Sequence, residues 1–351
     1  MNERSQPVGV APPAAEAEPD LRAKVAWLRD PQAYPEPPAR IESVETHMSW
    51  VFLTERHAYK MKKPVRYEYL DFSTLEAREK NCREELRLNR RLAPDVYLGV
   101  TALAVDAHGQ ARVEGGGRVV EWLVKMRRLP AGCMLDAVVR QHALEREDVR
   151  AVAALLAGFY SESPPVPVSA QEYRQDYERK IEINRDVLAA HADGLPGGLV
   201  AAVHADQLLY IRNSPEAFDR RVREGRIVEG HGDLRPEHIC LEGPPVIFDR
   251  LEFNRQFRIV DAADELASLA MECERLGVPW VGEGLFDVYA DITGDRPPSA
   301  LVRFYMTYRA CLRARLAILH TRELERAGWP KWETLTADYL RLAGEIVNRD
   351  S

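Results

Sequence analysis

Alternating hydrophobic and polar positions predict short β-strands in the first third of the chain. Three such runs occupy residues 40–45, 49–54 and 57–63. The dipeptide between the last two runs is typical of a hairpin turn. The period then changes to that of a helix, which we expect to begin with a capping box of Ser73 and Glu76 and to end before Pro94. Further strands are predicted at residues 96–107, 111–115 and 118–126.

Helical periodicity dominates the chain from Leu129 onward. Helices are predicted at residues 134–143, 148–163, 172–191, 203–224, 261–277, 282–292, 299–328 and 332–350. Short strands at 226–230, 238–243 and 245–249 interrupt them. We therefore expect an α+β protein with a disordered tail (1–19), a small antiparallel-sheet-plus-helix lobe (20–128) and a larger, mainly helical lobe (129–351).

Composition and charge exclude several classes of protein. The formal net charge of −7 argues against general nucleic-acid binding. The 5 cysteines form no C-x-x-C pair, which fits a reducing compartment. The N-terminus has no secretory signal pattern, and no hydrophobic run approaches the roughly 18 residues of a membrane span. The sequence thus predicts a cytoplasmic protein without a membrane or nucleic-acid partner.

The stretch "HGDLRPEHICLEGPPVIFD" (231–249) carries the candidate chemistry. A hairpin would bring Asp233 and Asp249 to the same edge, where one carboxylate could act as a base and the other could bind metal. An isolated H-G-D is more often a structured turn, because three-letter motifs recur by chance. A zinc site of His231, His238 and Asp249 is a weaker alternative, since the spacing fits no standard zinc motif.

This stretch resembles the catalytic region of the aminoglycoside phosphotransferase-like family, part of the protein-kinase-like superfamily. The family pattern is H-G-D, an Asn five residues later, and an apolar strand that ends in a metal-binding Asp. Here His238 stands in place of that Asn. The family often shows D-x-x-D-L-A further on, and this chain has "DAADELA" with Asp261 and Asp264, one of which would support the catalytic loop.

The first lobe carries the same resemblance. Kinase-like folds place A-x-K on a strand, where the Lys binds phosphates and a Glu on the next helix orients it. "HAYKMKK" supplies Ala58 and Lys60, with Lys62 on the same strand face as a rival. The helix offers Glu84 and Glu85, of which Glu85 has the neighbour spacing of a core-packed position.

The resemblance implies that two further segments of the chain contact the nucleotide. The loop before the second strand lacks the Gly-rich pattern of protein kinases, so Thr46 or Ser49 and backbone N–H groups would have to contact phosphate. The connector with Lys125, Met126 and Arg127 would be the hinge, whose backbone meets adenine. The chain has no G-x-x-x-x-G-K-[ST] motif, which some members of an uncharacterised branch carry in an added domain.

The resemblance implies a two-lobed, kinase-like phosphotransferase that uses ATP and Mg²⁺ on a small-molecule acceptor. Asp233, in the loop with His231, would be the base; Asp249 would bind metal, and His238 would bind a second metal or support the first. His238 also makes Mn²⁺ a candidate, because an imidazole nitrogen is a softer ligand than an amide oxygen. A nucleotide-binding pseudokinase and an AMP-transferring enzyme remain alternatives.

One late helix adds a basic face. Arg309, Arg313 and Arg315 lie within the predicted helix 299–328. Such a face is most often solvated or salt-bridged, and the functional alternative is contact with the cleft between the lobes or with an anionic substrate.

Overall fold

The computed structural model describes residues 19–191, 197–323 and 328–350. The tail predicted at residues 1–19 lies almost entirely outside the described residues. The chain divides into two compact units. The first unit comprises the residues up to Cys82 together with Gly99–Met126, and the second comprises Arg83–Leu98 together with Arg127–Ser351.

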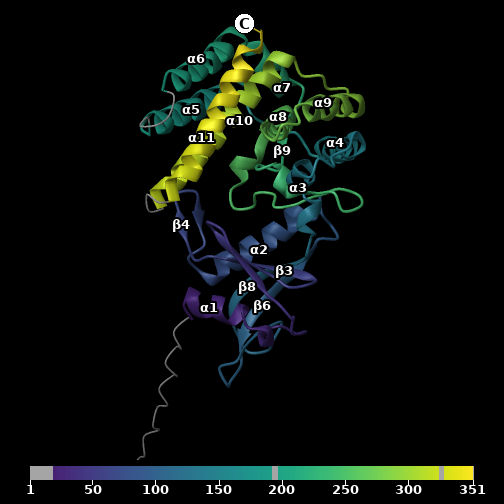
Figure 1. The fold of residues 1–351 in the computed structure, drawn as a ribbon, viewed down its shortest axis with the longest axis vertical. Coiled ribbons are helices and arrows are strands. Elements are labelled where there is room, and N and C mark those ends of the chain that lie inside the picture. The colour runs from purple at the N-terminus through teal and green to yellow at the C-terminus, as the bar shows by residue number, and fades with distance from the viewer. Residues whose placement is uncertain (1–18, 192–196, 324–327, 351) are drawn as a thin grey trace, which may run out of the picture. The chain divides into compact units, whose positions relative to one another are not determined.

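A six-stranded sheet forms the centre of the first unit, with strand order β1-β2-β3-β8-β6-β7 (Figure 1). Its strands are β1 (Glu42–Glu45), β2 (Ser49–Leu53), β3 (His57–Lys62), β6 (Tyr97–Val105), β7 (Ala111–Val113) and β8 (Arg118–Arg127). The pairs β1–β2, β2–β3 and β6–β7 are antiparallel. A small antiparallel pair, β4 (Arg66–Tyr67) with β5 (Leu70–Asp71), precedes helix α2 (Leu75–Asn89). All six predicted strands of this region are confirmed.

The sheet buries alternate side chains on one face, as the strand period requires. Phe52, Tyr59, Met61 and Leu123 belong to a hydrophobic cluster that also contains Leu28 of helix α1 (Leu21–Leu28). Buried ion pairs bind helices to the same sheet: Glu121 of β8 receives Lys24 Nζ of α1 at 3.0 Å and Arg78 Nε of α2 at 2.8 Å.

Helix α2 begins at Leu75, but the residue that caps it differs from the predicted one. Thr74, rather than Ser73, accepts a hydrogen bond from a backbone N–H of the first turn, that of Ala77, at 3.2 Å. The Ser73 hydroxyl instead donates to Asp71 Oδ1 at 2.6 Å. The predicted capping box of Ser73 and Glu76 is therefore wrong. Asp71 accepts the Ser73 hydroxyl, and the Thr74 hydroxyl caps the helix.

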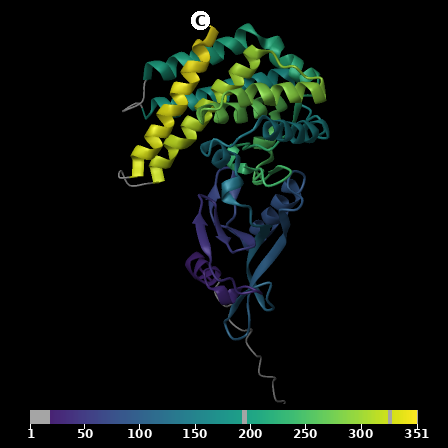
Figure 2. The ribbon, with the colours of Figure 1, turned by 45° about the vertical axis from the view of Figure 1, so that its right-hand side comes forward.

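The second unit is mainly helical. Its helices are α3 (Leu135–Arg140), α4 (Arg146–Ser161), α5 (Ala170–Ala189), α6 (Gly197–Asn213), α7 (Pro215–Arg223), α8 (Ala262–Arg275), α9 (Trp280–Thr293), α10 (Ser299–Leu319) and α11 (Trp329–Val347). Its short strands are β9 (Ile227–Glu229), β10 (Ile239–Cys240), β11 (Val246–Ile247) and β12 (Ile259–Asp261). Helices α10 and α11 run side by side in both ribbon views (Figures 1 and 2). The predicted mixed architecture is confirmed.

Two predicted helices are divided or shortened. The segment predicted at 203–224 forms α6 and α7, because Pro215 removes a backbone donor and starts the second helix at its first position. The helix predicted at 299–328 ends as α10 at Leu319 and continues as a 3₁₀ turn (His320–Glu323).

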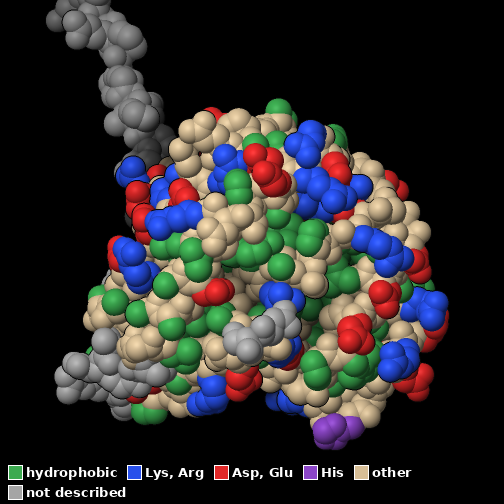
Figure 3. Space-filling view, turned by 90° about the horizontal axis from the view of Figure 1, so that it is seen from above, with side chains coloured by type: hydrophobic (Ala, Val, Ile, Leu, Met, Phe, Trp, Pro, Cys, Tyr) green, Lys and Arg blue, Asp and Glu red, His purple; other side chains and the backbone are tan. Residues whose placement is uncertain are grey.

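Charged side chains of both signs are interspersed on the face shown in Figure 3, where hydrophobic side chains gather around a central hollow. Within the described residues, no helix combines the length and the hydrophobicity that a membrane span needs.

Candidate functional site

The residues of the H-G-D motif form a tight turn after β9, which we call the HGD loop (231–233). Gly232 has φ = +92°, a conformation that side-chain-bearing residues rarely adopt, and a Cβ atom there would lie 3.1 Å from the Arg258 side chain. The His231 side chain is fully buried and its Nε2 bonds the carbonyl of Phe248 at 2.9 Å. Burial lowers the pKa of His231, which keeps the ring neutral and makes it a structural member of the loop.

A buried carboxylate on α8 binds the backbone of this loop. Glu265 Oε2 accepts the N–H of His231 at 2.8 Å, and Oε1 accepts the N–H of Gly232 at 2.6 Å. The hydroxyl of Tyr160 donates to Oε2 at 2.9 Å. Gly230 is also required here, because a Cβ atom would lie 2.6 Å from Glu265 Oε2. Three donors on one carboxylate fix the path of the loop.

The Asp233 side chain follows directly and is 39% exposed. Burial raises its pKa, but the positive charge of Arg313, with a smaller contribution from Arg235, outweighs this effect. The pKa of Asp233 therefore lies below the ordinary value, and the carboxylate is ionised at neutral pH. A half-exposed, ionised carboxylate on a fixed loop can accept a proton from a bound hydroxyl group.

His238 and Asp249 come together next to Asp233. The Nδ1 atom of His238 bonds the carbonyl oxygen of Asp233 at 2.9 Å. A carbonyl only accepts, so Nδ1 carries the hydrogen and Nε2 presents a lone pair in the neutral ring. That Nε2 lies 3.6 Å from Asp249 Oδ2. One cation could contact both atoms, and a histidine oriented through its other nitrogen is typical of a metal ligand.

Asp249 has a strained backbone that its neighbours hold in place. Its φ is +61°, in the left-handed region that few residues other than glycine adopt. Its N–H donates to the Tyr97 hydroxyl at 3.1 Å. The next N–H, that of Arg250, donates to Asn89 Oδ1 at 2.7 Å, and that of Leu251 donates to the carbonyl of His231 at 3.1 Å. Three such bonds around one strained residue are the pattern expected where a side chain must point in a fixed direction.

The candidate lysines share one face of β3. Lys62 is only 1% exposed and lies 5.4 Å from the centre of the Phe72 ring, whereas Lys60 is half-buried. In the antiparallel register Ser49 is directly opposite Lys62, and Val51 is opposite Lys60. The predicted phosphate contact Ser49 therefore neighbours the rival lysine, and the choice between Lys60 and Lys62 remains open.

The two candidate glutamates of α2 differ in environment. Glu85 is completely buried. Glu84 Oε1 forms an ion pair with Arg87 Nη2 at 2.7 Å and lies 3.8 Å from Arg258 Nη2. The burial of Glu85 fits the expectation that it is the core-packed position. A role for either glutamate in orienting a lysine remains a prediction.

The predicted hinge residues end β8. Lys125 Nζ pairs with Glu114 at 2.7 Å, and Met126 is buried. Arg127 donates its backbone N–H to the carbonyl of Val96 at 2.8 Å. Their contact with adenine remains a prediction.

The residue that supports the HGD loop was missed by the sequence reasoning. Asp261 caps α8 and pairs with Arg221 at 2.7 Å, and Asp264 binds Arg309 and the Tyr177 hydroxyl. Within the part of the chain that the structure describes, neither aspartate forms a hydrogen bond with the loop, whereas the adjacent Glu265 does. The sequence signal that could have indicated Glu265 is its position one residue after Asp264, at the start of a predicted helix.

The described residues do not favour a zinc site. Across residues 19–191, 197–323 and 328–350, no three His, Cys, Asp or Glu side chains are grouped so that they could hold a metal ion. His238 and Asp249 alone fit a cation that takes its other ligands from phosphate oxygens and water, as Mg²⁺ usually does.

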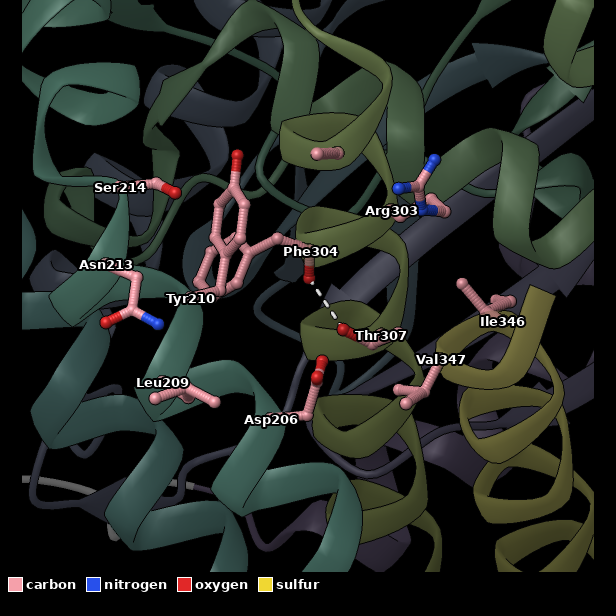
Figure 4. Close-up of a pocket in the computed structure, with 11 residues that line it drawn as sticks. Asp206, Leu209, Tyr210, Asn213, Ser214, Arg303, Phe304, Thr307, Ile346 and Val347 are labelled. Atoms are coloured by element: carbon pink, nitrogen blue, oxygen red, sulfur yellow. Dashed lines mark hydrogen bonds between the residues drawn. The ribbon is translucent and has the colours of Figure 1, made fainter. Parts of the chain in front are cut away.

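The second unit also has a pocket of about 350 Å³ between α6, α10 and α11. Figure 4 shows the Tyr210 and Phe304 rings stacked at 5.4 Å and the Thr307 hydroxyl bonded to the carbonyl of Phe304 at 2.9 Å. Asp206 and Arg303 supply the charged groups. The residues of the predicted site do not line this pocket.

Comparison of the sequence with curated proteins finds uncharacterized proteins of Mycobacterium bovis and Mycobacterium tuberculosis, 33% identical over 279 residues. The match covers 79% of this chain and 54% of each relative, so the chain spans about half the length of the curated relatives it matches. No family model matches the chain.

Comparison of the fold with solved structures finds phosphotransferases and kinases of small molecules. The GDP complex of aminoglycoside 2′-phosphotransferase-IIIa is 15% identical with a TM-score of 0.49, covering 88% of this chain and 93% of the other. A choline/ethanolamine kinase family protein from Mesorhizobium loti is 14% identical with a TM-score of 0.49, covering 92% and 98%. A Plasmodium vivax ethanolamine kinase is 10% identical with a TM-score of 0.44, covering 86% and 81%. The names of these neighbours belong to the class that the sequence resembles.

Proposed function

We propose that the protein is a kinase-like phosphotransferase that transfers the γ-phosphoryl group of ATP to a hydroxyl group of a small molecule. One observation carries the proposal. The half-exposed carboxylate of Asp233 stands on a loop that Glu265 binds through its backbone, and His238 links this loop to Asp249. A candidate base and two candidate cation ligands thus lie within one short segment of the chain, which supports the proposal.

Asp233 is proposed to bind and orient the acceptor hydroxyl and to take its proton. The hydroxyl oxygen forms the new bond to the γ-phosphorus, the bond from that phosphorus to the β-γ bridging oxygen breaks, and ADP leaves. Asp249 and His238 would hold a divalent cation, which neutralises charge on the phosphates when it is bound. Lys60 is proposed to bind phosphate with Ser49 and Glu85 in supporting roles, and Lys62 is its rival.

Nucleotide titration and ATP turnover of two variants test these roles. Asp233→Asn should leave ATP binding intact and slow turnover by roughly 10²- to 10⁴-fold, the range of a positioned general base. Asp249→Asn should remove the part of ATP binding that depends on Mg²⁺. ATP hydrolysis, with water in place of the acceptor, is the readout.

Asp291→Asn is the matched control, because Asp291 is an exposed aspartate of α9 with 72% of its side chain accessible. It should change neither binding nor turnover. If Asp233→Asn abolished binding while turnover per bound nucleotide stayed normal, the two roles would be wrongly assigned. Wild-type protein that binds ATP and never turns it over would support the pseudokinase alternative.

A further inference from the structure

Arg313 of α10 reaches the candidate base from a helix far along the chain. Its Nη1 lies 3.5 Å from Asp233 Oδ1, and its side chain is 16% exposed. Asp233 and Arg313 are 80 residues apart. The contact therefore joins the HGD loop to a helix that neither the motif nor its flanks predict.

The guanidinium group of Arg313 is itself held in place. Its Nε lies 3.2 Å from Oε1 of Glu272 on α8, a carboxylate with no exposed surface. Glu272 also receives the Tyr339 hydroxyl of α11 at 2.8 Å and Arg275 Nε at 3.0 Å. Because α8 and α11 supply these groups, the guanidinium group cannot turn without breaking a buried contact with Glu272.

The fixed guanidinium restricts the Asp233 carboxylate. The terminal torsion of an aspartate is broad and roughly two-fold, so an unbound carboxylate can present either oxygen. A donor on Oδ1 favours one orientation, in which Oδ2 can accept a proton from another partner. We propose that Arg313 is a positioning residue, which holds Asp233 Oδ1 so that Oδ2 accepts the proton of the acceptor hydroxyl. This inference rests on the proposed phosphotransferase function.

The charges around Asp233 give the contact a second effect. Arg313 faces Asp233 from α10, while Arg235, His238 and His231 face it from its own segment. Arg313 is the largest of these opposite-charge influences on the pKa of Asp233. Removal of its charge should therefore raise the pKa of Asp233 and move the acid limb of turnover to higher pH.

Two other arginines of α10 allow the proposed role of Arg313 to be distinguished from a general effect of positive charge on this helix. Arg309 pairs with Asp264 and has the structural role expected of a salt-bridged face. Arg315 is half-buried and has no ion pair with a carboxylate among the described residues; the group next to it is Tyr308. Two residues along a helix correspond to about 200°, so Arg315 faces away from the side that carries Arg313.

The test compares Arg313→Gln, Arg313→Lys and the control Arg315→Gln, which removes the same charge from the same helix. Arg313→Gln leaves the buried Glu272 with Arg275 as its remaining cation and could weaken folding, so the double variant Arg313→Gln/Glu272→Gln removes both charges of the pair. Three quantities are measured: ATP turnover with its KM, the pH dependence of turnover, and the pKa of Asp233 from the ¹³C signal of its carboxyl group.

We expect Arg313→Gln and the double variant to lower kcat by roughly 10- to 100-fold, as a misplaced reacting group does, with KM for ATP unchanged. The pKa of Asp233 should rise in both. Arg313→Lys should keep the low pKa and recover part of kcat, and Arg315→Gln should match the wild type.

A raised pKa with unchanged kcat would overturn the positioning role, and so would equal losses in Arg313→Gln and Arg315→Gln. Wild-type protein that turns over no ATP would refute the proposed function itself. In that case the carboxyl titration still decides whether Arg313 acts on Asp233, so the two failures are distinguishable.

Discussion

Replacement of Glu265 by glutamine should loosen the HGD loop. The carboxylate accepts the N–H of Gly232 on Oε1 and the N–H of His231 on Oε2. A glutamine amide has one oxygen and one NH₂ group, so in either orientation a donor faces one of these two N–H groups. One backbone donor of the loop therefore loses its partner.

The size of the effect follows from the bond that is lost. A hydrogen bond to a charged group contributes about 1.5–3 kcal/mol, and Glu265 is 1% exposed, so water does not replace it easily. If the loop opens locally, the same free energy appears as amide exchange that is roughly 10- to 150-fold faster. ATP turnover should fall in the same variant, because Asp233 is carried by this loop.

Hydrogen exchange followed by mass spectrometry on the peptide that contains residues 231–233 measures the opening. Glu283→Gln is the control, since Glu283 is an exposed glutamate of α9. Exchange in that peptide should be unchanged by Glu283→Gln and faster in Glu265→Gln. Equal exchange in Glu265→Gln and wild type would refute the reasoning that Glu265 holds the loop.

The remaining predictions concern cofactor binding and pH. Lys60→Ala should weaken ATP binding more than Lys62→Ala, because Lys60 has the A-x-K spacing; a larger loss at the buried Lys62 in the same titration would reverse the assignment. His238→Asn should shift the ratio of activities from Mn²⁺ toward Mg²⁺, because an amide oxygen suits Mg²⁺ better than an imidazole nitrogen does, and an unchanged ratio would remove His238 from the metal site. Burial lowers the pKa of His231, so the unfolded chain binds its proton more readily and the free energy of unfolding should fall as the pH drops below about 6.5. Urea unfolding at pH 7.5 and 5.0 should show a smaller fall in His231→Gln than in the wild type, and an equal fall would contradict the assignment.

Local patterns predicted most of the secondary structure. The strands around Lys60 and the helix that carries Glu85 follow from hydrophobic period and turn residues alone. Two errors have different local causes. Asp71 accepts a hydrogen bond from the Ser73 hydroxyl, which therefore does not cap the helix. Pro215 divides a periodic segment into two helices.

The site was predicted only as far as its local motif extends. Asp233, His238 and Asp249 lie within one short segment, and the structure brings them together. The supporting contacts of Glu265 and Arg313 span 33 and 80 residues, and no spacing rule in a single sequence reports such distances. The left-handed backbone of Asp249 could not be predicted either, because hydrogen bonds to distant residues hold it: its N–H donates to Tyr97, and the next N–H donates to Asn89.

The fate of the nucleotide tests the central claim most directly. Wild-type protein and Asp233→Asn would be incubated with ATP and Mg²⁺, and the products followed by ³¹P NMR. A phosphotransferase should give ADP, with the γ-phosphate released as inorganic phosphate or as a phosphate ester, and the rate should fall by roughly 10²- to 10⁴-fold in Asp233→Asn. Formation of AMP, or formation of ADP at the same rate in both proteins, would contradict the central claim.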